Sequence, residues 1–451
     1  MELFQNPNSP TNSAEEPIFL FLIPLLPAKT IRVCSYNVAL AQTSEGRLAA
    51  LLRGGGNTSA KRVAEVVQII QPDVLLLNEF DYDRFGTGVT RMNDLYFKVS
   101  QNGRTSQDYP YRYAAISNTG IHSGFDLDND GVVDDTPGDE SYGGDAFGFG
   151  EFPGKFAMAV FSKYPIDEEA VRTFEEVLWK EMPGNLIPPG YYSTAEQEVF
   201  RISSKSHWDV PIKVMGTTFH FLVSHPTPPV FDGPEDRNGR RNHDEIRLWA
   251  DYLTPGAAEY LGGGLAPGAR FVVAGDQNAD PTRGDSVNAA INQLLDHPRV
   301  AGDFVPERTG AVTASNRLDT ATFNLRVDYV LPSQAGFAIE DGAVFWPTGG
   351  QDGANLVTVS DHRPVYLDLK LVPLIDEAVR ELKVVAEGDF YRISWDTGEG
   401  VSYGLEKSSD LSEDSWEALP GIEIIAGEGQ ASALVSPGGA TEFYRVMAYY
   451  E

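Results

Sequence analysis

The chain has 451 residues, of which 42% are hydrophobic and 22% are charged. This composition argues against a disordered chain, and the length predicts two or three domains. The 35 basic and 65 acidic residues give a net charge of −30, which argues against a tight, nonspecific DNA-binding protein. A nuclease that releases its substrate quickly stays compatible with this charge.

The first apolar segment covers residues 18–26, which is shorter than the ~20 residues that span a bilayer. It has the length of a signal-peptide core, but Glu15 and Glu16 stand where basic residues belong and Pro24 interrupts it. We therefore interpret residues 1–30 as an N-terminal segment that is signal-like, a mis-assigned start, or a peripheral strand. No transmembrane segment is expected.

Six apolar runs end in, or contain, a small set of polar residues. Runs of β-branched and large apolar residues bounded by turn formers predict buried strands, and strand ends are where a sheet presents catalytic groups. Cys34, the only cysteine, lies inside the first run and is interpreted as a core residue. The polar residues, which we expect to converge on one site, are Asn37, Glu79, His225, Asp276, Asn278, Asp328, Asp361 and His362.

Helical patterns lie between these strands. Val63, Val66, Val67 and Ile70 recur at helical spacing and predict a helix over residues ~59–71. Similar spacing predicts a second helix around Ile246, Trp249, Ala250 and Leu253, and a third around Ile291, Leu294 and Leu295.

At the polar residues of the six runs, the chain resembles the endonuclease/exonuclease/phosphatase superfamily of metal-dependent phosphoesterases. The resemblance covers residues 31–372 and keeps the order of the family's motifs. It implies an α/β (α+β) fold, a four-layer α/β/β/α sandwich of two mainly antiparallel sheets. The alternation of strand and helix patterns agrees with this fold.

The resemblance implies that a divalent metal assists the hydrolysis of a phosphate ester, because the nucleophile must approach a negatively charged centre. Glu79 would be the principal Mg²⁺ or Mn²⁺ ligand, and Asn37 would hold that carboxylate or share the metal. Asp361 would complete the metal end of the site. Oxygen ligands suit both cations.

The remaining roles also follow from the resemblance. Asp276 would orient and deprotonate the attacking water, and Asn278 would bond the scissile phosphate or a metal-bound water. His225 and His362 would stabilise charge on the phosphoryl oxygens or protonate the leaving oxygen, and Asp328 would orient His362. A histidine at position 225 favours the deoxyribonuclease, sphingomyelinase and inositol-phosphatase branches over the exonuclease-III-like branch.

Two stretches, residues ~81–155 and ~226–243, are longer than in a minimal family member. Loops of this length beside an active site usually shape the substrate pocket. In the second stretch, Arg237, Arg240 and Arg241 are candidates to clamp a substrate phosphate. Local pairing of these arginines with nearby carboxylates is an equally open alternative. Glu151, in the first stretch, is a candidate acidic partner of the histidine at 225.

The first stretch also contains acidic residues with the one-three-five spacing, and the glycine at six, of a calcium loop. Its twelfth position is Pro137 instead of glutamate, so Asp134 or Asp135 must close the shell. An acidic solvated turn is the alternative. A structural Ca²⁺ would favour a secreted or periplasmic location, where calcium is abundant. The predicted ligands are Asp126, Asp128, Asp130, Val132, Asp134 and Asp135.

Residues 375–451 contain five short strand patterns at roughly ten-residue spacing, separated by Gly, Pro, Asp and Ser. This pattern predicts a small C-terminal β-sandwich, which looks like the accessory modules of secreted bacterial enzymes. No catalytic cluster stands out in it.

Three functions are compatible with these observations. The first is a metal-dependent phosphodiesterase, with an extracellular nuclease as one form. The second is a phosphomonoesterase acting on a sugar, inositol or lipid phosphate. The third is an inactive binding protein that keeps the fold. The expected partner is a phosphate-ester substrate, without a stable nucleic-acid complex, and the oligomeric state is not predicted.

Overall fold

The computed structural model describes residues 19–22, 29–372, 380–387, 390–396, 401–408, 417–419, 425–427, 430–436 and 443–450. The chain divides into two compact units. The catalytic unit comprises Thr30–Val214 and Thr218–Lys370, and the accessory unit comprises Met1–Lys29, Met215–Thr217 and Leu371–Glu451.

The first sheet of the catalytic unit has seven strands in the order β10-β12-β13-β2-β3-β5-β4. Strands β2 and β3 are parallel, with Asn37 opposite Asn78, and β13 runs antiparallel to β2. The sheet therefore brings the polar ends of β2 and β3 to one edge. The strands are β2 (Thr30–Asn37), β3 (Val74–Asn78), β4 (Tyr111–Tyr113), β5 (Met158–Ser162), β10 (Glu307–Arg308), β12 (Phe337–Val344) and β13 (Val365–Leu371).

The second sheet has five strands in the order β11-β9-β8-β7-β6. Strands β8 and β9 are parallel, whereas β9 and β11 are antiparallel, with Asp276 opposite Asp328. This register sets two carboxylates side by side. The strands are β6 (Arg172–Thr173), β7 (His207–Val214), β8 (Thr217–Ser224), β9 (Arg270–Asp276) and β11 (Asp328–Pro332).

The two sheets pack face to face through contacts of β9 with β2 and β3, and of β11 with β2. Helix α2 (Thr58–Ile70) covers the outer face of the seven-stranded sheet, with Val63, Val66, Val67 and Ile70 buried against it. Its first turn is capped by Asn57, whose side chain accepts from Ala60 N. The predicted helix over residues ~59–71 is thus present.

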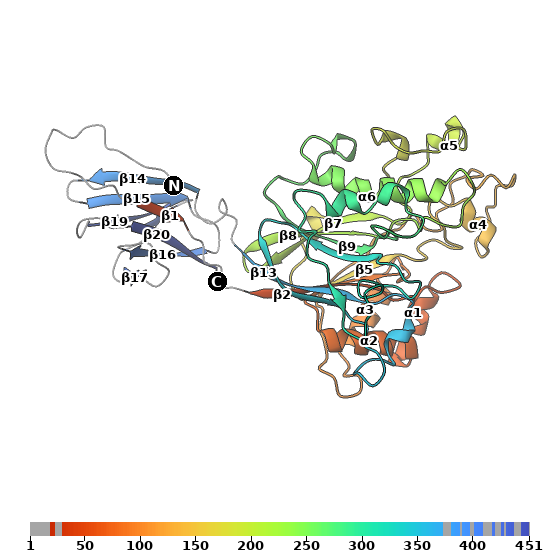
Figure 1. Cartoon of the computed structure of the whole chain (residues 1–451), viewed down its shortest axis with the longest axis horizontal. Coiled ribbons are helices and arrows are strands. Elements are labelled where there is room, and N and C mark those ends of the chain that lie inside the picture. Colours follow the sequence, from red (N-terminus) through yellow and green to blue (C-terminus); the bar gives the residue numbers. More distant parts are fainter. Residues whose placement is uncertain are drawn as a thin grey trace. The chain divides into compact units, whose positions relative to one another are not determined.

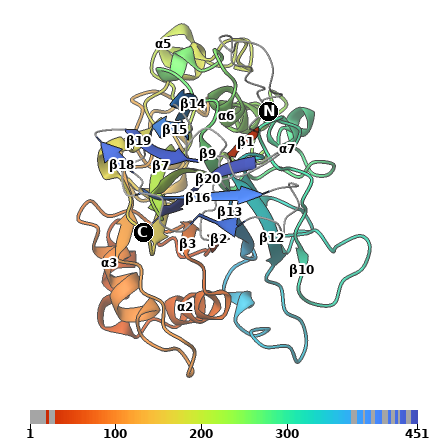
Figure 2. The ribbon, with the colours of Figure 1, turned by 90° about the vertical axis from the view of Figure 1, so that its left-hand side faces the viewer.

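Helix α6 (Arg237–Leu253) covers the outer face of the five-stranded sheet, where Trp249 and Tyr252 join the core of β8 and β9. The layers confirm the predicted four-layer α/β/β/α sandwich (Figures 1 and 2). The other helices are α1 (Arg47–Leu51), η1 (Arg53–Gly55), α3 (Thr87–Met92), η2 (Asn93–Phe97), α4 (Glu140–Gly144), η3 (Glu168–Ala170), η4 (Trp179–Glu181), α5 (Thr194–Gln197), η5 (Glu259–Leu261), η6 (Val287–Ala289), α7 (Asn292–Leu295) and η7 (Val357–Val359).

The two long stretches of the sequence carry more regular structure than their composition indicates. Residues ~81–155 include α3, η2, the edge strand β4 and α4. Within ~226–243, helix α6 begins at Arg237, so the connection from β8 covers residues 225–236. Irregular chain therefore lies directly before β5 and directly after β8.

The accessory unit contains two four-stranded sheets, β1-β20-β16-β17 and β14-β15-β19-β18. Alternate residues are buried on β15 and β19, for example Ile393 and Trp395, and Tyr444 and Val446 are buried on β20. The predicted small β-sandwich is confirmed. The strands are β1 (Phe19–Leu22), β14 (Arg380–Glu387), β15 (Phe390–Asp396), β16 (Val401–Ser408), β17 (Glu417–Ala418), β18 (Ile425–Gly427), β19 (Gln430–Val435) and β20 (Phe443–Tyr450).

Residues 19–22 of the N-terminal segment form β1, which pairs parallel with β20, so that Phe19 lies opposite Phe443. These four residues are part of the apolar segment of residues 18–26, to which the peripheral-strand interpretation refers. The rest of the segment before Lys29 lies outside the described residues. Across the described part of the chain, no helix has both the length and the apolar character needed to cross a membrane.

Candidate active site

Asn37, at the end of β2, links the two sheets of the catalytic unit. Its Nδ2 donates to Glu79 Oε1 at 3.0 Å and to Asp276 Oδ2 at 3.1 Å, while its Oδ1 accepts from Ala39 N. The side chain of Asn37 is fully buried. One amide group therefore holds together the carboxylates that follow β3 and end β9.

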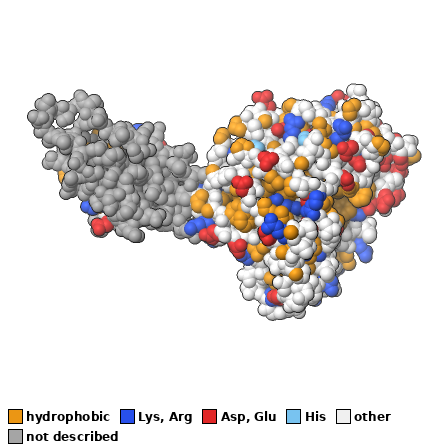
Figure 3. All heavy atoms as spheres, viewed as in Figure 1, with side chains coloured by type: hydrophobic (Ala, Val, Ile, Leu, Met, Phe, Trp, Pro, Cys, Tyr) orange, Lys and Arg blue, Asp and Glu red, His pale blue; other side chains and the backbone are white. Residues whose placement is uncertain are grey.

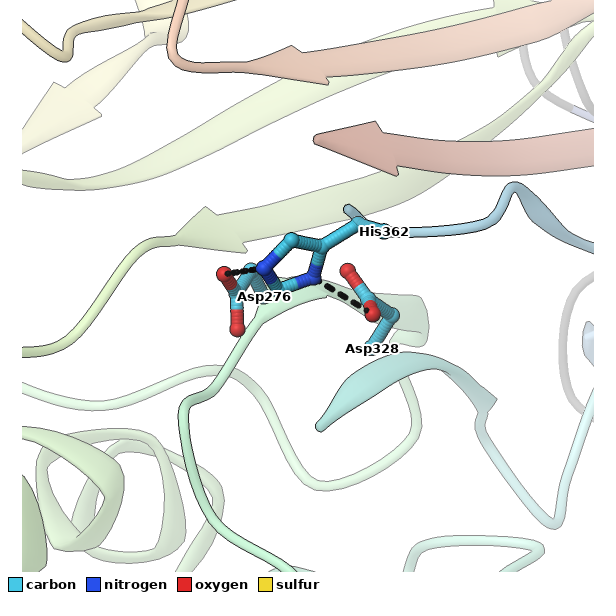
Figure 4. A group of neighbouring side chains, drawn as sticks. All are labelled: Asp276, Asp328 and His362. Carbon is cyan, nitrogen blue, oxygen red and sulfur yellow. Dashed lines mark hydrogen bonds and ion pairs between the residues drawn. The ribbon is translucent and has the colours of Figure 1, made fainter. Parts of the chain in front are cut away.

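His362 lies between the carboxylates of Asp276 and Asp328 (Figure 4). Its Nδ1 is 2.9 Å from Asp328 Oδ2, and its Nε2 is 3.5 Å from Asp276 Oδ2. The hydroxyl of Ser360 accepts from His362 N and donates to Asn37 O, which ties the loop before β13 to the end of β2. The imidazole is thus held in one orientation.

The two carboxylates determine the charge of this histidine. Burial lowers the pKa of His362, but Asp328 and Asp276 outweigh burial and raise the pKa to about 10. Burial also raises the pKa of Asp276 to about 6, against the opposing charge of His362. At neutral pH His362 is therefore protonated on both ring nitrogens. Its Nδ1 donates to Asp328, and its Nε2 forms a longer ion pair with Asp276.

His225, directly after β8, approaches the same oxygen from another direction, with Nε2 3.5 Å from Asp276 Oδ2. Burial lowers the pKa of His225 well below its usual range, and the charges of Lys205 and His362 lower it further. Its buried Nδ1 has no hydrogen-bond partner within the described chain. Glu151, the candidate partner of His225, forms an ion pair with Lys155 instead.

The backbone at the site is unusual. Glu79 (φ +57°) and Asn278 (φ +52°) both adopt the left-handed conformation, which non-glycine residues rarely take. Gly275 has φ +145°, and a Cβ there would lie 2.0 Å from Ser224 O, so glycine is required between β8 and Asp276. In the Gly-Asp-x-Asn motif, the glycine thus allows β8 and β9 to approach closely. The residues after it form a turn in which Asn278 N donates to Asp276 Oδ1 at 3.0 Å.

The residues present fit a divalent metal. Burial raises the pKa of Glu79, against the hydrogen bond from Asn37, and Asp276 is similarly affected. The Glu79 carboxylate is bonded to the neutral amide of Asn37, and a hard cation beside it would supply the compensating charge. Asp276, Asp328 and His362 also have ligand atoms within 4.8 Å of one another. Asp361, predicted at the metal end, is exposed and lines the same cavity as Glu79.

A cavity of about 450 Å³ opens onto these groups. It is lined by Glu79, His225, Asp276, Asn278, Asp361 and His362 of the predicted set, while Asn37 and Asp328 support the set through hydrogen bonds. The structure therefore brings all eight predicted active-site residues together.

The three arginines proposed as phosphate clamps lie elsewhere. Arg241 is buried and donates to the backbone carbonyls of Phe147, Arg201 and Ile202. Arg237 is ion-paired with Glu235, and Arg240 Nε donates to Glu235 O. The cavity wall instead includes Arg283, whose Nη2 is 2.9 Å from Asp280 and 2.7 Å from Asp319.

Sequence reasoning missed two residues behind the site. Lys205 is 7% exposed, and burial lowers its pKa, against the charges of Glu245, Asp276 and Glu79. Asn78 accepts from Asp276 N and donates to Ser224 O, so it spaces β3 from β8 and β9. Asn78 could have been found from its place beside Glu79. Lys205 follows a run of serines that carries no such signal.

The acidic loop of the first long stretch has the expected turn. Carboxylate oxygens of Asp126, Asp128 and Asp130 lie within 4.8 Å of one another. Gly131 N donates to Asp126 Oδ2 at 2.9 Å. The buried Asp145 accepts from Leu127 N and Asp134 N and so closes the loop from behind. Asp134 is fixed through its backbone, and Val132 is 55% exposed.

The fold and site define a metal-dependent phosphoesterase, a hydrolase that acts on phosphate esters. The model of the Endonuclease/Exonuclease/phosphatase family matches residues 34–362, and the chain belongs to this family. The predicted family is thereby confirmed. A comparison with curated proteins finds no match.

Several solved structures are similar. An endonuclease/exonuclease/phosphatase from Beutenbergia cavernae is 16% identical, with 93% of this chain and 92% of that chain covered and a TM-score of 0.43. Sphingomyelinase C from Streptomyces griseocarneus is 17% identical, covering 75% and 99%, with a TM-score of 0.39. The human Nocturnin catalytic domain with bound sulfate is 14% identical, covering 78% and 97%, with a TM-score of 0.40.

Proposed function

We propose that this protein is a Mg²⁺- or Mn²⁺-dependent phosphodiesterase. The observation that supports a diester is the charge of the cavity. Among its described lining residues the cations are His362 and Arg283, and Arg283 is already paired with two aspartates. A phosphomonoester is a dianion near neutral pH, whereas a diester carries one charge and needs less compensation. The cavity also extends beyond the catalytic groups, which leaves room for a second ester group.

The roles follow from the contacts of each side chain. Asp276, bonded to Asn37 and facing two histidines, would hold the attacking water and accept its proton. His362, kept cationic by Asp328, would donate from Nε2 to a phosphoryl oxygen, and His225 would act beside it. Asn278, whose Nδ2 donates to Pro226 O, would limit where the phosphate can lie.

Glu79, with Asn37 behind it, would hold the metal, and Asp361 on the same cavity would approach from the open side. When bound, the ion supplies a Lewis acid that offsets the charge of the phosphate. The alternative, a phosphomonoesterase of the same fold, would use the same residues. It would have to balance the two negative charges of a monoester instead of the single charge of a diester. An inactive binding protein is disfavoured because all eight predicted active-site residues converge.

The test is hydrolysis of bis-p-nitrophenyl phosphate and p-nitrophenyl phosphate in parallel, after chelation and addition of Mg²⁺, Mn²⁺ or Ca²⁺. We expect metal-dependent cleavage of the diester, and a loss of about 10²-fold or more in kcat for His362→Ala. Glu79→Gln should weaken metal binding in calorimetry. Faster cleavage of the monoester would favour the phosphatase, and no cleavage of either with normal metal binding would favour a binding protein.

We also propose that the loop over residues 126–135 binds a structural Ca²⁺ and that the protein is secreted or periplasmic. Asp and Glu side chains gather at the margin of the catalytic unit where Figure 1 draws α4, the helix that follows this loop (Figure 3). Ca²⁺ should raise the melting temperature more than Mg²⁺ does, and Asp128→Asn should remove that increase. An equal increase in the variant would contradict the site.

A further inference from the structure

Part of the lining of the active-site cavity is apolar. This apolar wall comes from two segments, the connection between β8 and α6 and the turn before β11. A phosphate bound at His225 and His362 would therefore have one ester group facing hydrocarbon. The apolar wall consists of Pro228, Pro229, Val230, Phe231, Phe323 and Leu325.

Phe231 is the outermost part of the apolar wall and is 87% exposed. Its backbone has φ +66°, a left-handed conformation that is costly for a bulky residue. Three prolines precede it within residues 226–230 and restrict the backbone, while Asn238 Nδ2 donates to Val230 O at 2.7 Å. The chain thus holds a phenyl ring in solvent at the mouth of the cavity, at a conformational cost that ligand contact would explain.

Phe323 belongs to the second segment of the apolar wall, on the turn that precedes Leu325, and is 46% exposed. Its ring meets the His362 ring edge to face, with centroids 5.4 Å apart. The apolar wall therefore begins directly beside the group that would face the phosphate. An ester group attached to that phosphate would reach Phe323 first and Phe231 further out.

The charges of the cavity exclude a highly charged ligand from this wall. Arg283 is bonded to Asp280 and Asp319, and Asp285 and Asp361 add exposed negative charge to the lining. A polyanion such as nucleic acid needs several unpaired cations along its path. A volume of about 450 Å³ suits a single small ligand.

We propose that the substrate is a small phosphodiester with one apolar ester group, and that Phe231 and Phe323 bind this group. The inference rests on the proposed phosphodiesterase function and specifies its substrate class. The apolar group supplies binding energy by leaving water, and the diester brings only one negative charge into a cavity whose Arg283 is already paired with two aspartates.

The test is calorimetric binding of diethyl phosphate and dibutyl phosphate to the full chain with Mg²⁺. Two further buried methylenes on one ester group, at about fourfold each, give an expected preference of about fifteenfold for the dibutyl ester. Phe231→Ala should reduce that preference severalfold. Phe85→Ala is the matched control, because Phe85 is 76% exposed but does not line the cavity. Melting curves check that all variants fold.

Equal affinity for both diesters, or a preference that survives in Phe231→Ala and Phe323→Ala, would overturn the inference. Tighter binding of a short oligonucleotide than of dibutyl phosphate would overturn it in favour of nucleic acid. Hydrolysis of butyl and ethyl p-nitrophenyl phosphate separates this inference from the function. Preferential binding without hydrolysis supports the apolar wall and contradicts the phosphodiesterase, whereas hydrolysis without preference supports only the phosphodiesterase.

Discussion

The carboxylate oxygen Asp276 Oδ2 is the common partner of three side chains in the site. Asn37 Nδ2, His225 Nε2 and His362 Nε2 all lie within 3.5 Å of it. Two histidines beside one carboxylate have opposite electrostatic environments. Asp328 keeps His362 charged, whereas burial, together with nearby positive charges, keeps His225 neutral. The pair can therefore offer a fixed donor and a separate neutral imidazole at the same phosphate.

The charge of His362 predicts a pH-dependent stability difference. Its pKa is raised from 6.5 to about 10 in the folded protein, so its stabilising contribution is present below pH 6.5 and is lost as pH rises towards 10. His362→Asn should destabilise the chelated protein by on the order of 3 kcal/mol at pH 7, and by clearly less at pH 10. Urea denaturation at both values measures the difference.

His297→Asn is the control for that experiment. Burial lowers the pKa of His297 below 6.5, so this histidine is neutral throughout the range and its replacement should have the same effect at both pH values. If His362→Asn destabilises the protein equally at pH 7 and pH 10, the positive charge of the His362 imidazole does not contribute to stability, and the prediction is wrong.

The predictability of single residues depended on where they lie in strands. The eight residues predicted for the active site follow or begin apolar runs, and the structure places them in or directly behind one cavity. Lys205 and Arg283 lie in segments of mixed polarity, and their contact with the cavity or its carboxylates comes only from the tertiary fold. Arg241 is the opposite case, a residue predicted to bind substrate that does not line the cavity. The sequence cannot reveal that its guanidinium donates to three backbone carbonyls.

At the scale of elements, helix α6 positions the catalytic loops as well as the core. Asn242 on α6 is fully buried, and its Nδ2 donates to Thr227 O at 2.8 Å and to Gln277 O at 2.9 Å. These carbonyls belong to the loops that carry His225 and Asn278. The helix therefore fixes the distance between two strand ends that are not neighbours in sequence.

Asn242→Ala should leave both carbonyls without this donor and cost about 1–3 kcal/mol in the free energy of unfolding. Because the loops of His225 and Asn278 lose a common anchor, kcat for the diester should fall by about tenfold. Steady-state kinetics and urea denaturation measure both effects. Asn355→Ala, at an exposed position, is the control. Full activity in the folded Asn242→Ala variant would show that the loops are positioned without α6.

The elements themselves were largely predictable, because α2, α6 and the buried strands have clear periodicity. The lengths of the irregular stretches could not be predicted, because α3, η2 and β4 form in a part of the chain whose composition is typical of a loop. The apolar wall was also not predictable. Phe231 and Phe323 are separated by more than ninety positions in sequence, and the turn and the proline-rich connection meet only at the cavity.

At the scale of the whole molecule, the net charge of −30 should distinguish between substrate classes. A polyanion is repelled at long range by such a protein, and salt screens that repulsion over a Debye length of about 10 Å at 0.1 M. A small diester with one negative charge feels far less repulsion. The same enzyme should therefore respond differently to ionic strength with the two kinds of substrate.

At fixed Mg²⁺, raising NaCl from 0.02 M to 0.2 M should increase kcat/KM for an oligonucleotide severalfold and change kcat/KM for ethyl p-nitrophenyl phosphate by less than about twofold. Initial rates on both substrates with one enzyme preparation give the comparison. A decrease with salt on the oligonucleotide would mean that a local cluster of basic residues binds it despite the net charge, as counterion release requires. That outcome would favour the nuclease form, since a cavity with one paired arginine does not account for it.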